Sequence, residues 1–78
     1  MPKILIADDE PDLELIIRQK FRSKIREGSL QFEFAENGAV ALQKLTEDPS
    51  IDLMFTDINM PVMDGLTLLG QVQSRGML

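Results

Sequence analysis

The sequence predicts a doubly wound α/β fold, in which helices cover both faces of a parallel sheet. The first observation is that short apolar or alternating runs, typical of strands, alternate with segments of helical periodicity in the order β-α-β-α-β-α. The second is that Pro, Gly and Asn residues separate these segments, where turns and helix ends favour them. A helix joins each strand to the next and carries the chain back to the same end of the sheet. With the usual right-handed crossovers, we therefore expect the three strands to be parallel.

The first unit is a strand over Lys3–Ala7 followed by one helix. The strand is a short run of Ile and Leu, which predicts burial. The helix is expected to begin at Pro11, a residue suited to the first turn, with Asp9 or Glu10 as the N-cap. Gly28 suits its C-terminal stop. The apolar face of this helix comprises Leu13, Ile16, Ile17, Phe21 and Ile25.

The second unit begins with Leu30–Phe34, which alternates strictly between apolar and polar residues. This alternation predicts a strand with only one face buried, and therefore an edge strand. Asn37-Gly38 then breaks the chain before a short helix that ends ahead of Asp48-Pro49. The apolar positions of that helix are Ala41, Leu42 and Leu45.

The third unit begins with a strand over Ile51–Thr56. From Leu53 to Phe55 it is apolar on both faces, a pattern typical of an interior parallel strand. A loop is expected over residues 60–63, followed by a helix with Asp64 as N-cap and Gly76 as stop. The predicted apolar stripe of this helix comprises Leu66, Leu69, Val72 and Gln73.

The strand patterns also predict the order of the sheet. The alternating second strand belongs at an edge, so the first strand is expected between the second and the third, in the order 2-1-3. This is the beginning of the flavodoxin-like order, whose switch point lies between the first and third strands. Ligands of such sheets bind outside the carboxyl ends of the strands at that point.

Composition limits the class of protein. The 78 residues include 8 Lys and Arg, 13 Asp and Glu and no Cys, which predicts one small acidic domain or a piece of one. The absence of Cys excludes disulfides and thiolate metal sites and favours a cytoplasmic location. The apolar N-terminal run is too short for a signal peptide or a membrane span. Without a cluster of Lys and Arg, we expect no direct binding to nucleic acid.

Three carboxylates are expected to meet at the switch point, since Asp8 and Asp9 follow the first strand and Asp57 follows the third. Two like charges about 4 Å apart repel by up to about 4 kcal/mol at an effective dielectric constant of 20, so a proton or a cation must offset them. Oxygen ligands in a chain without His or Cys favour a hard cation, and a few carboxylates plus waters suit Mg²⁺. A divalent metal would also let a neighbouring carboxylate accept a phosphoryl group.

Two segments carry a resemblance to a known family. The first run is Ile-Leu-Ile-Ala-Asp-Asp-Glu over residues 4–10, in which the acidic pair comes directly after the first predicted strand. The second is Asp-Ile-Asn-Met-Pro-Val-Met-Asp-Gly over residues 57–65, which comes directly after the third. Together they resemble the receiver domain of two-component response regulators. The resemblance implies that Asp57 is the phospho-acceptor and that Asp8, Asp9 and Asp57, with the backbone carbonyl of Asn59, hold Mg²⁺. It also implies a histidine kinase or phosphotransfer protein as phosphoryl donor, and a signalling role rather than an enzymatic one.

The resemblance covers residues 1–78 but ends after the third helix. A complete receiver continues through two more βα units, whose strands end in a Ser or Thr and in a Lys. After Asp57 this chain has one basic residue, Arg75, and two hydroxyls, Thr67 and Ser74, none at a matching position. The expectation is therefore a receiver fragment that lacks the last two βα units and in which phosphorylation is impaired or incomplete.

Two other functions compete with this one. The first is a dimerisation or protein-binding module that is derived from a receiver and does not use phosphorylation. The second is a Mg²⁺-dependent phosphatase with an aspartyl nucleophile, which requires a second acid where this chain has Asn59. The third strand has the apolar pattern of an interior strand, but the order 2-1-3 places it at an edge. This mismatch also favours self-association through that strand or through helix faces.

Several of these residues also have structural interpretations. One of the acids at positions 8–10 is expected to cap the first helix, and Asp64 is interpreted as a cap rather than as a ligand. The methionines at positions 54, 60 and 63 are interpreted as packing residues.

Overall fold

The computed structural model describes residues 2–57 and 63–76. It contains three strands, β1 (Lys3–Ala7), β2 (Gln31–Ala35) and β3 (Leu53–Thr56). The helices are α1 (Pro11–Lys20), α2 (Arg22–Glu27), α3 (Gly38–Glu47) and α4 (Gly65–Ser74). In this part of the chain no helix is long and apolar enough to cross a membrane.

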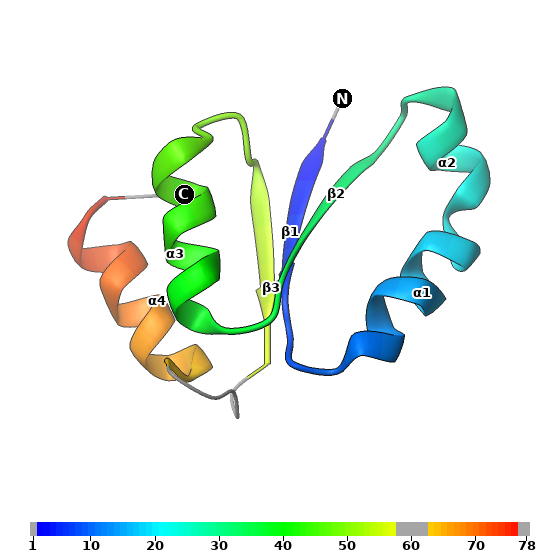
Figure 1. The fold of residues 1–78 in the computed structure, drawn as a ribbon. Coiled ribbons are helices and arrows are strands. Elements are labelled where there is room, and N and C mark those ends of the chain that lie inside the picture. Colours follow the sequence, from blue (N-terminus) through cyan, green and yellow to red (C-terminus); the bar gives the residue numbers. More distant parts are fainter. Residues whose placement is uncertain (1, 58–62, 77–78) are drawn as a thin grey trace.

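The sheet is parallel, with the order β2-β1-β3, as predicted. Figure 1 shows three layers, with α1 and α2 on one side of the sheet and α3 and α4 on the other. The register places Ile6 between Phe34 and Phe55 in one row across the sheet. The neighbouring row joins Leu5 to Met54. Because successive side chains of a strand point to opposite faces, these rows face different helical layers.

The core lies between the sheet and the α3–α4 layer. Its buried side chains are Leu5, Ala7, Ala35, Ala41, Leu42, Leu45, Ile51, Leu68 and Val72. Met54 and Met63 are half-buried against this cluster, which confirms their interpretation as packing residues; Met60 lies outside the described residues. On the other side, neither α1 nor α2 contributes a buried residue.

The first helical segment differs from the prediction because it is broken at Phe21 into α1 and α2. Phe21 leaves the helical region at ψ 22°, although its N–H still donates to the Ile17 carbonyl at 3.0 Å. Its ring meets that of Phe32 on β2, with centroids 5.6 Å apart. The predicted caps are confirmed: Glu10 accepts from the N–H of Asp12, and Gly28 adopts φ 79°. Ile16, expected on the packed face, is 56% exposed.

The packed stripe of α4 was predicted correctly at Val72 and incorrectly at Leu66 and Leu69. Gly65, Leu68 and Val72 are buried, whereas Leu66 and Leu69 are exposed. Both stripes satisfy helical spacing, and the one that packs is set by the contact of α4 with α3. The boundaries of β3 differ as well, because Ile51 is buried ahead of the strand rather than within it.

Candidate metal centre

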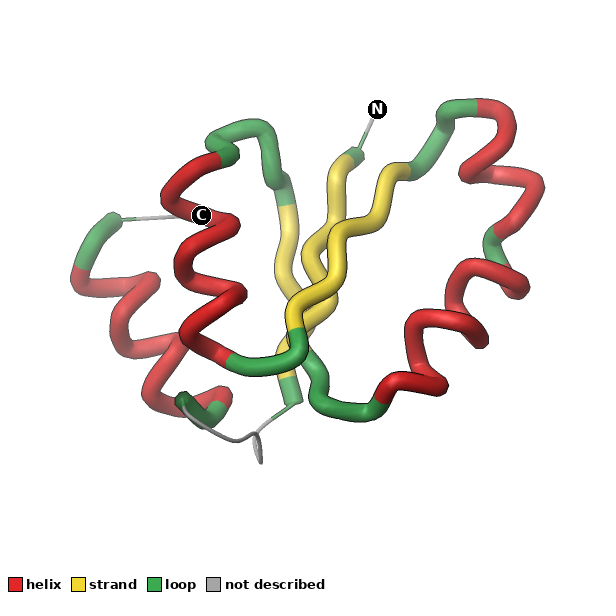
Figure 2. The backbone as a smooth tube through the Cα atoms, in the orientation of Figure 1, coloured by secondary structure: helices red, strands yellow, loops and turns green. Residues whose placement is uncertain are grey.

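The backbone places two acids at the carboxyl edge of the sheet. Asp8 directly follows β1, and its N–H donates to the carbonyl of Ala35 at 2.9 Å. Asp57 directly follows β3, and its N–H donates to the carbonyl of Ala7 at 2.8 Å. Each acid is thus tied to a neighbouring strand by a hydrogen bond that extends the sheet by one residue. The loops that carry them lie at the same end of the strands (Figure 2).

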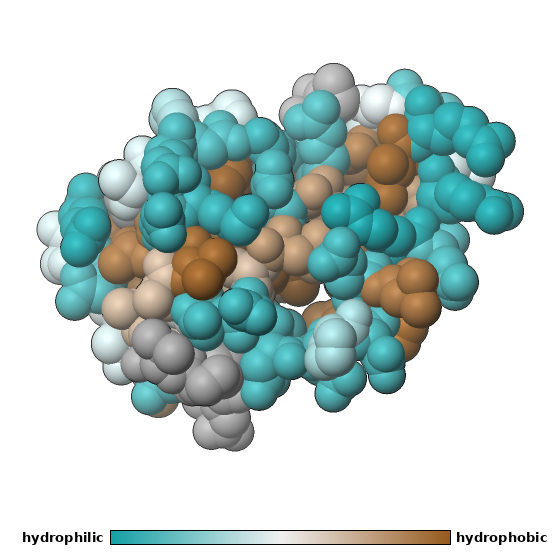
Figure 3. Space-filling view, in the orientation of Figure 1, coloured by the Kyte–Doolittle hydropathy of each residue, from teal (hydrophilic) through white to brown (hydrophobic). Residues whose placement is uncertain are grey.

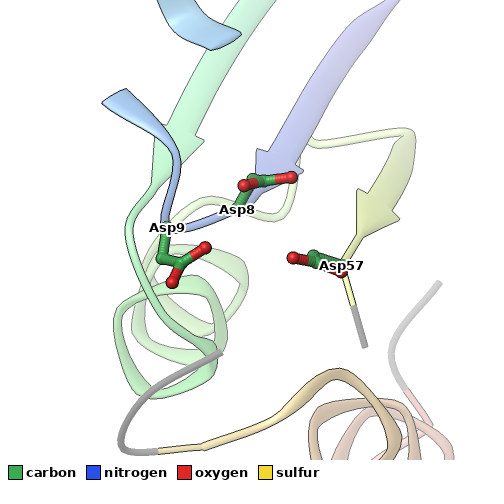
Figure 4. Close-up of side chains that lie close together, drawn as sticks. All are labelled: Asp8, Asp9 and Asp57. Atoms are coloured by element: carbon green, nitrogen blue, oxygen red, sulfur yellow. The ribbon is translucent and has the colours of Figure 1, made fainter. Parts of the chain in front are cut away.

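The side chains of Asp8, Asp9 and Asp57 converge, as the sequence predicted. Each offers a carboxylate oxygen, and these oxygens all lie within 4.8 Å of one another. Figure 4 shows the three carboxylates around a common gap, two from the loop after β1 and one from the end of β3. Asp8 and Asp57 are half-buried and Asp9 is exposed. The topology therefore brings together residues that are 49 positions apart in the sequence.

The three consecutive acids that follow β1 have different roles. Asp8 Oδ1 accepts a hydrogen bond from the N–H of Glu10 at 2.8 Å, which fixes the turn into α1. Glu10 in turn caps α1, since its Oε1 accepts from the N–H of Asp12 at 3.4 Å. Capping therefore accounts for Glu10 and leaves the convergence of Asp8 and Asp9 on Asp57 to be explained by another role.

Two cavities meet at Asp8. One, of about 520 Å³, is lined by the carboxylates of Asp8, Asp9, Glu10, Glu14 and Glu36. The other, of about 460 Å³, is apolar apart from the end that holds Asp8, Thr56 and Asp57. No Lys or Arg lines either cavity within the described part of the chain. The local field therefore favours a cation and disfavours a free anion.

Glu36 also lines the 520 Å³ acidic cavity, although it was not predicted from the sequence as part of the site. It directly follows β2, so it lies at the same carboxyl edge of the sheet as Asp8 and Asp57. The prediction was limited to the two strands on either side of the switch point, β1 and β3.

The donor set fits a hard divalent cation. It consists of carboxylate oxygens, and the chain has neither His nor Cys to offer a softer ligand. Three carboxylates that leave space for water match the way proteins bind Mg²⁺. The carbonyl of Asn59, implied as a further ligand, lies outside the described residues.

The end of the segment that follows Asp57 is anchored to two helices. Asp64 Oδ1 accepts from the N–H of Thr67 at 2.8 Å, which caps α4 and lowers the pKa of that carboxyl. The carbonyl of Met63 accepts from the N–H of Gly38, the first residue of α3, at 3.0 Å. A Cβ at position 38 would lie 2.4 Å from that carbonyl oxygen, so only Gly permits this approach. From the sequence, Gly38 was predicted as part of a chain break, but its contact with Met63 was not predicted.

Comparison with known proteins decides the family. A family model described as the response regulator receiver domain matches residues 4–77. The chain belongs to the response regulator receiver family. This receiver is 38% identical over 71 residues to the chemotaxis protein CheY of Bacillus subtilis, an alignment that covers 91% of the chain and 56% of CheY.

Solved structures agree with this assignment. The response regulator TrrA of Thermotoga maritima, crystallised with Mg²⁺ and BeF, superimposes on this receiver with a TM-score of 0.79 and 32% identity, over 96% of this chain and 61% of TrrA. TrrA in complex with the histidine kinase ThkA gives a TM-score of 0.78, also at 32% identity, over 96% and 60% of the two chains. The receiver therefore spans about three fifths of the length of these relatives.

Proposed function

We propose that this receiver accepts a phosphoryl group on Asp57 and binds Mg²⁺ through Asp8, Asp9 and Asp57. The observation that carries the proposal is the convergence of three carboxylate oxygens within 4.8 Å at the switch point of the sheet. The crystal structure of TrrA with Mg²⁺ and BeF supports it, because that relative is similar over nearly the whole of this chain.

In the proposed reaction, a carboxylate oxygen of Asp57 attacks the phosphorus of a phosphohistidine. The P–N bond breaks as the O–P bond forms, and the imidazole nitrogen leaves with the electron pair and takes up a proton. Asp8, Asp9 and Asp57 would hold the metal, and Asp8 is itself oriented by the N–H of Glu10. When bound, Mg²⁺ neutralises negative charge on the transferred phosphoryl oxygens.

The proposed donor is a histidine kinase or a phosphotransfer protein. Residues 1–78 contain no His, so none of their own side chains can be the phosphohistidine donor. The complex of TrrA with ThkA supports a kinase as the partner, since TrrA is 32% identical to this chain. In this proposal the receiver is a cytoplasmic signalling module rather than an enzyme. Self-association is proposed as a second protein contact.

Residues 1–78 are proposed to form the first three βα units of a receiver. A second candidate function is a protein-binding module that does not use phosphorylation. It is favoured by the large apolar side chains that are exposed among the described residues: Leu15, Ile16, Leu53, Phe55, Leu66 and Leu69.

Binding of beryllofluoride with Mg²⁺ separates the two candidates. Calorimetric titration of the wild-type chain is expected to give saturable binding that requires both components. Asp57→Asn is expected to abolish it, whereas Asp64→Asn, which alters a nearby acid that caps α4, is expected to leave it unchanged. Absence of binding to a folded wild-type chain would overturn the phospho-acceptor proposal and support the binding module.

A further inference from the structure

The cations of the chain are concentrated in one segment. Residues 18–26 contain none of the 13 Asp and Glu residues but five of the eight Lys and Arg residues: Arg18, Lys20, Arg22, Lys24 and Arg26. All five are exposed, and Figure 3 shows hydrophilic side chains over α2 at its upper right. The expectation that the chain has no cluster of Lys and Arg was therefore wrong, because the acidity of the chain as a whole concealed this segment.

The three arginines of this segment line a shallow groove of about 380 Å³, together with Gln19 and Ile25. The groove spans the break at Phe21, since Arg18 and Gln19 belong to α1 and the other lining residues to α2. Ile25 is half-buried and is the only apolar residue of the lining. The aliphatic stems of the arginines extend this apolar surface, and their guanidinium groups remain exposed to solvent.

Arginine and lysine are separated on this segment. The cations that line the groove are all Arg, whereas Lys20 and Lys24 do not line it. A planar guanidinium can pair with a carboxylate through two parallel hydrogen bonds, which an ammonium group cannot do. Arg is also enriched at protein interfaces, where Lys is depleted. This separation therefore favours recognition of carboxylates over a general solubilising role.

Two of the three arginines are available to a ligand. Arg18 is already held, because its Nε donates to Glu14 Oε2 at 2.9 Å and its guanidinium lies 5.0 Å from the ring centroid of Phe34 on β2. Arg22 and Arg26 form no ion pair within the described part of the chain. A ligand of the groove would therefore pair mainly with these two side chains.

The groove lies on the β2 side of the sheet, far from the acidic cluster. The contact of Arg18 with Phe34 joins it to β2. α1 begins beside the carboxyl ends of the strands, and α2 leads back to the amino end of β2 (Figure 1). In the flavodoxin-like order 2-1-3-4-5, β2 is an edge strand and further strands join beyond β3. Such strands would lie at the opposite edge of the sheet from this groove.

We propose that this groove binds a short acidic segment of a partner protein. Arg22 and Arg26 are four residues apart, which is about 6 Å along a helix axis. Acidic side chains at alternate positions of an extended segment recur at about 6.6 Å, so two of them can meet both guanidinium groups. An apolar side chain two positions further on would pack against Ile25. This interaction goes beyond phosphoryl transfer and does not depend on it.

A protein segment suits the groove better than nucleic acid does. The rest of the chain holds all 13 acids and only three cations, so a long polyanion that extended past the groove would meet negative charge. A segment of a few residues can avoid this repulsion. The phosphate backbone of a duplex also has no apolar side chain to cover Ile25.

Fluorescence anisotropy with a labelled peptide at low ionic strength tests the proposal. The probe contains Glu-Thr-Glu-Thr-Leu, and a control peptide contains Gln in place of both Glu residues. The wild-type chain is expected to bind the probe saturably and at least about tenfold more tightly than the control. Absence of this difference with a folded chain would overturn the proposal. Tighter binding of a short DNA duplex than of the probe would also overturn it, in favour of nucleic acid.

Matched double variants locate the binding. Arg22→Ala with Arg26→Ala is expected to raise the dissociation constant of the probe at least about tenfold. Lys20→Ala with Lys24→Ala removes the same charge from outside the groove and is expected to raise it less than about threefold. Equal effects would indicate nonspecific attraction and overturn the proposal.

The two-pronged geometry is tested by Arg22→Lys with Arg26→Lys, which keeps the charge and the fold of an exposed surface. Because Lys cannot form two parallel hydrogen bonds with one carboxylate, this variant is expected to weaken binding severalfold. Unchanged affinity would overturn recognition by guanidinium groups.

Discussion

The two faces of the sheet are packed very differently. On the α3–α4 side, helices and strands share a core in which Leu5 and Leu68 are completely buried. On the α1–α2 side, no residue of α1 or α2 is buried, and two contacts with the sheet involve phenylalanine rings of β2. The ring of Phe21 meets Phe32, and the guanidinium of Arg18 lies 5.0 Å from the ring centroid of Phe34.

Side-chain size accounts for much of this difference. Toward α3 the ends of β1 and β2 present Ala7 and Ala35, and α3 itself presents Ala41, so the backbones approach closely. The opposite face carries larger side chains, including Phe32, Phe34 and Phe55, which line or border the apolar 460 Å³ cavity beneath α1 and α2. Both faces are apolar, and the 460 Å³ cavity lies on the face that carries the large side chains. Stability is therefore expected to depend mainly on the α3–α4 side.

The largest effect is expected from truncating a buried side chain in the core on the α3–α4 side. Leu68→Ala removes a side chain with 0% exposure and is expected to lower the free energy of unfolding by about 2–5 kcal/mol. Leu15→Ala makes the same chemical change at a residue that is 59% exposed, and is expected to cost less than about 0.5 kcal/mol. Urea denaturation followed by circular dichroism measures both. Equal losses would contradict the contrast between the two faces.

An intermediate effect is expected where α3 meets the segment after Asp57. Gly38→Ala would place a Cβ 2.4 Å from the carbonyl oxygen of Met63 and is expected to cost about 1–3 kcal/mol. It is also expected to weaken beryllofluoride binding, because Met63 must move. Gly70→Ala, in α4 with no atom within 4 Å of the new Cβ, is expected to stabilise the chain by up to about 1 kcal/mol. Two changes of the same sign would contradict this prediction.

The smallest effect is expected from an ion pair that ties α3 to β1, and it depends on pH. Asp48 accepts hydrogen bonds from Lys3 Nζ and from Ser50, which lower its pKa from 3.8 to about 2. Because the pKa is lower in the folded state, the stabilisation is complete above about pH 4 and is lost as the pH falls toward 2. Asp48→Asn is thus expected to reduce the urea midpoint at neutral pH.

The pH dependence of that difference is the decisive measurement. The midpoints of wild type and Asp48→Asn are expected to converge between about pH 4 and pH 2. The control is Glu14→Gln, which breaks an exposed pair with Arg18 on α1 and is expected to cost about 0.3 kcal/mol. A wild-type advantage that persists below about pH 2 would exclude the Asp48 carboxylate as its source.

The strand order and the position of the acidic cluster could be predicted because both follow from short sequence patterns within or directly after a strand. Strict alternation over residues 30–34 placed β2 at an edge, and the order of the sheet followed. The acids after β1 and β3 then had to converge, since the ends of neighbouring parallel strands lie side by side. The side chains of Asp8, Asp9 and Asp57 meet as expected, and their roles in metal binding and phosphoryl transfer remain predictions.

Details of packing could not be predicted from periodicity. In α4 the stripes Leu66–Leu69 and Leu68–Val72 both have helical spacing, and only contact with α3 decides between them. The break at Phe21 coincides with a ring contact to Phe32, 11 residues away on another element. The close approach of Gly38 to Met63 likewise joins distant positions. Each of these features depends on tertiary contacts that a single sequence does not display.

The hydrogen bond from the N–H of Asp57 to the carbonyl of Ala7 also has a consequence for folding kinetics. It forms only after β3 has docked beside β1, a contact between residues 50 positions apart that requires closure of a long crossover. The acidic cluster therefore assembles late, and its mutual repulsion opposes the final docking step. Since salt screens such repulsion, added electrolyte should accelerate that step, and a cation that binds the cluster should slow its reversal.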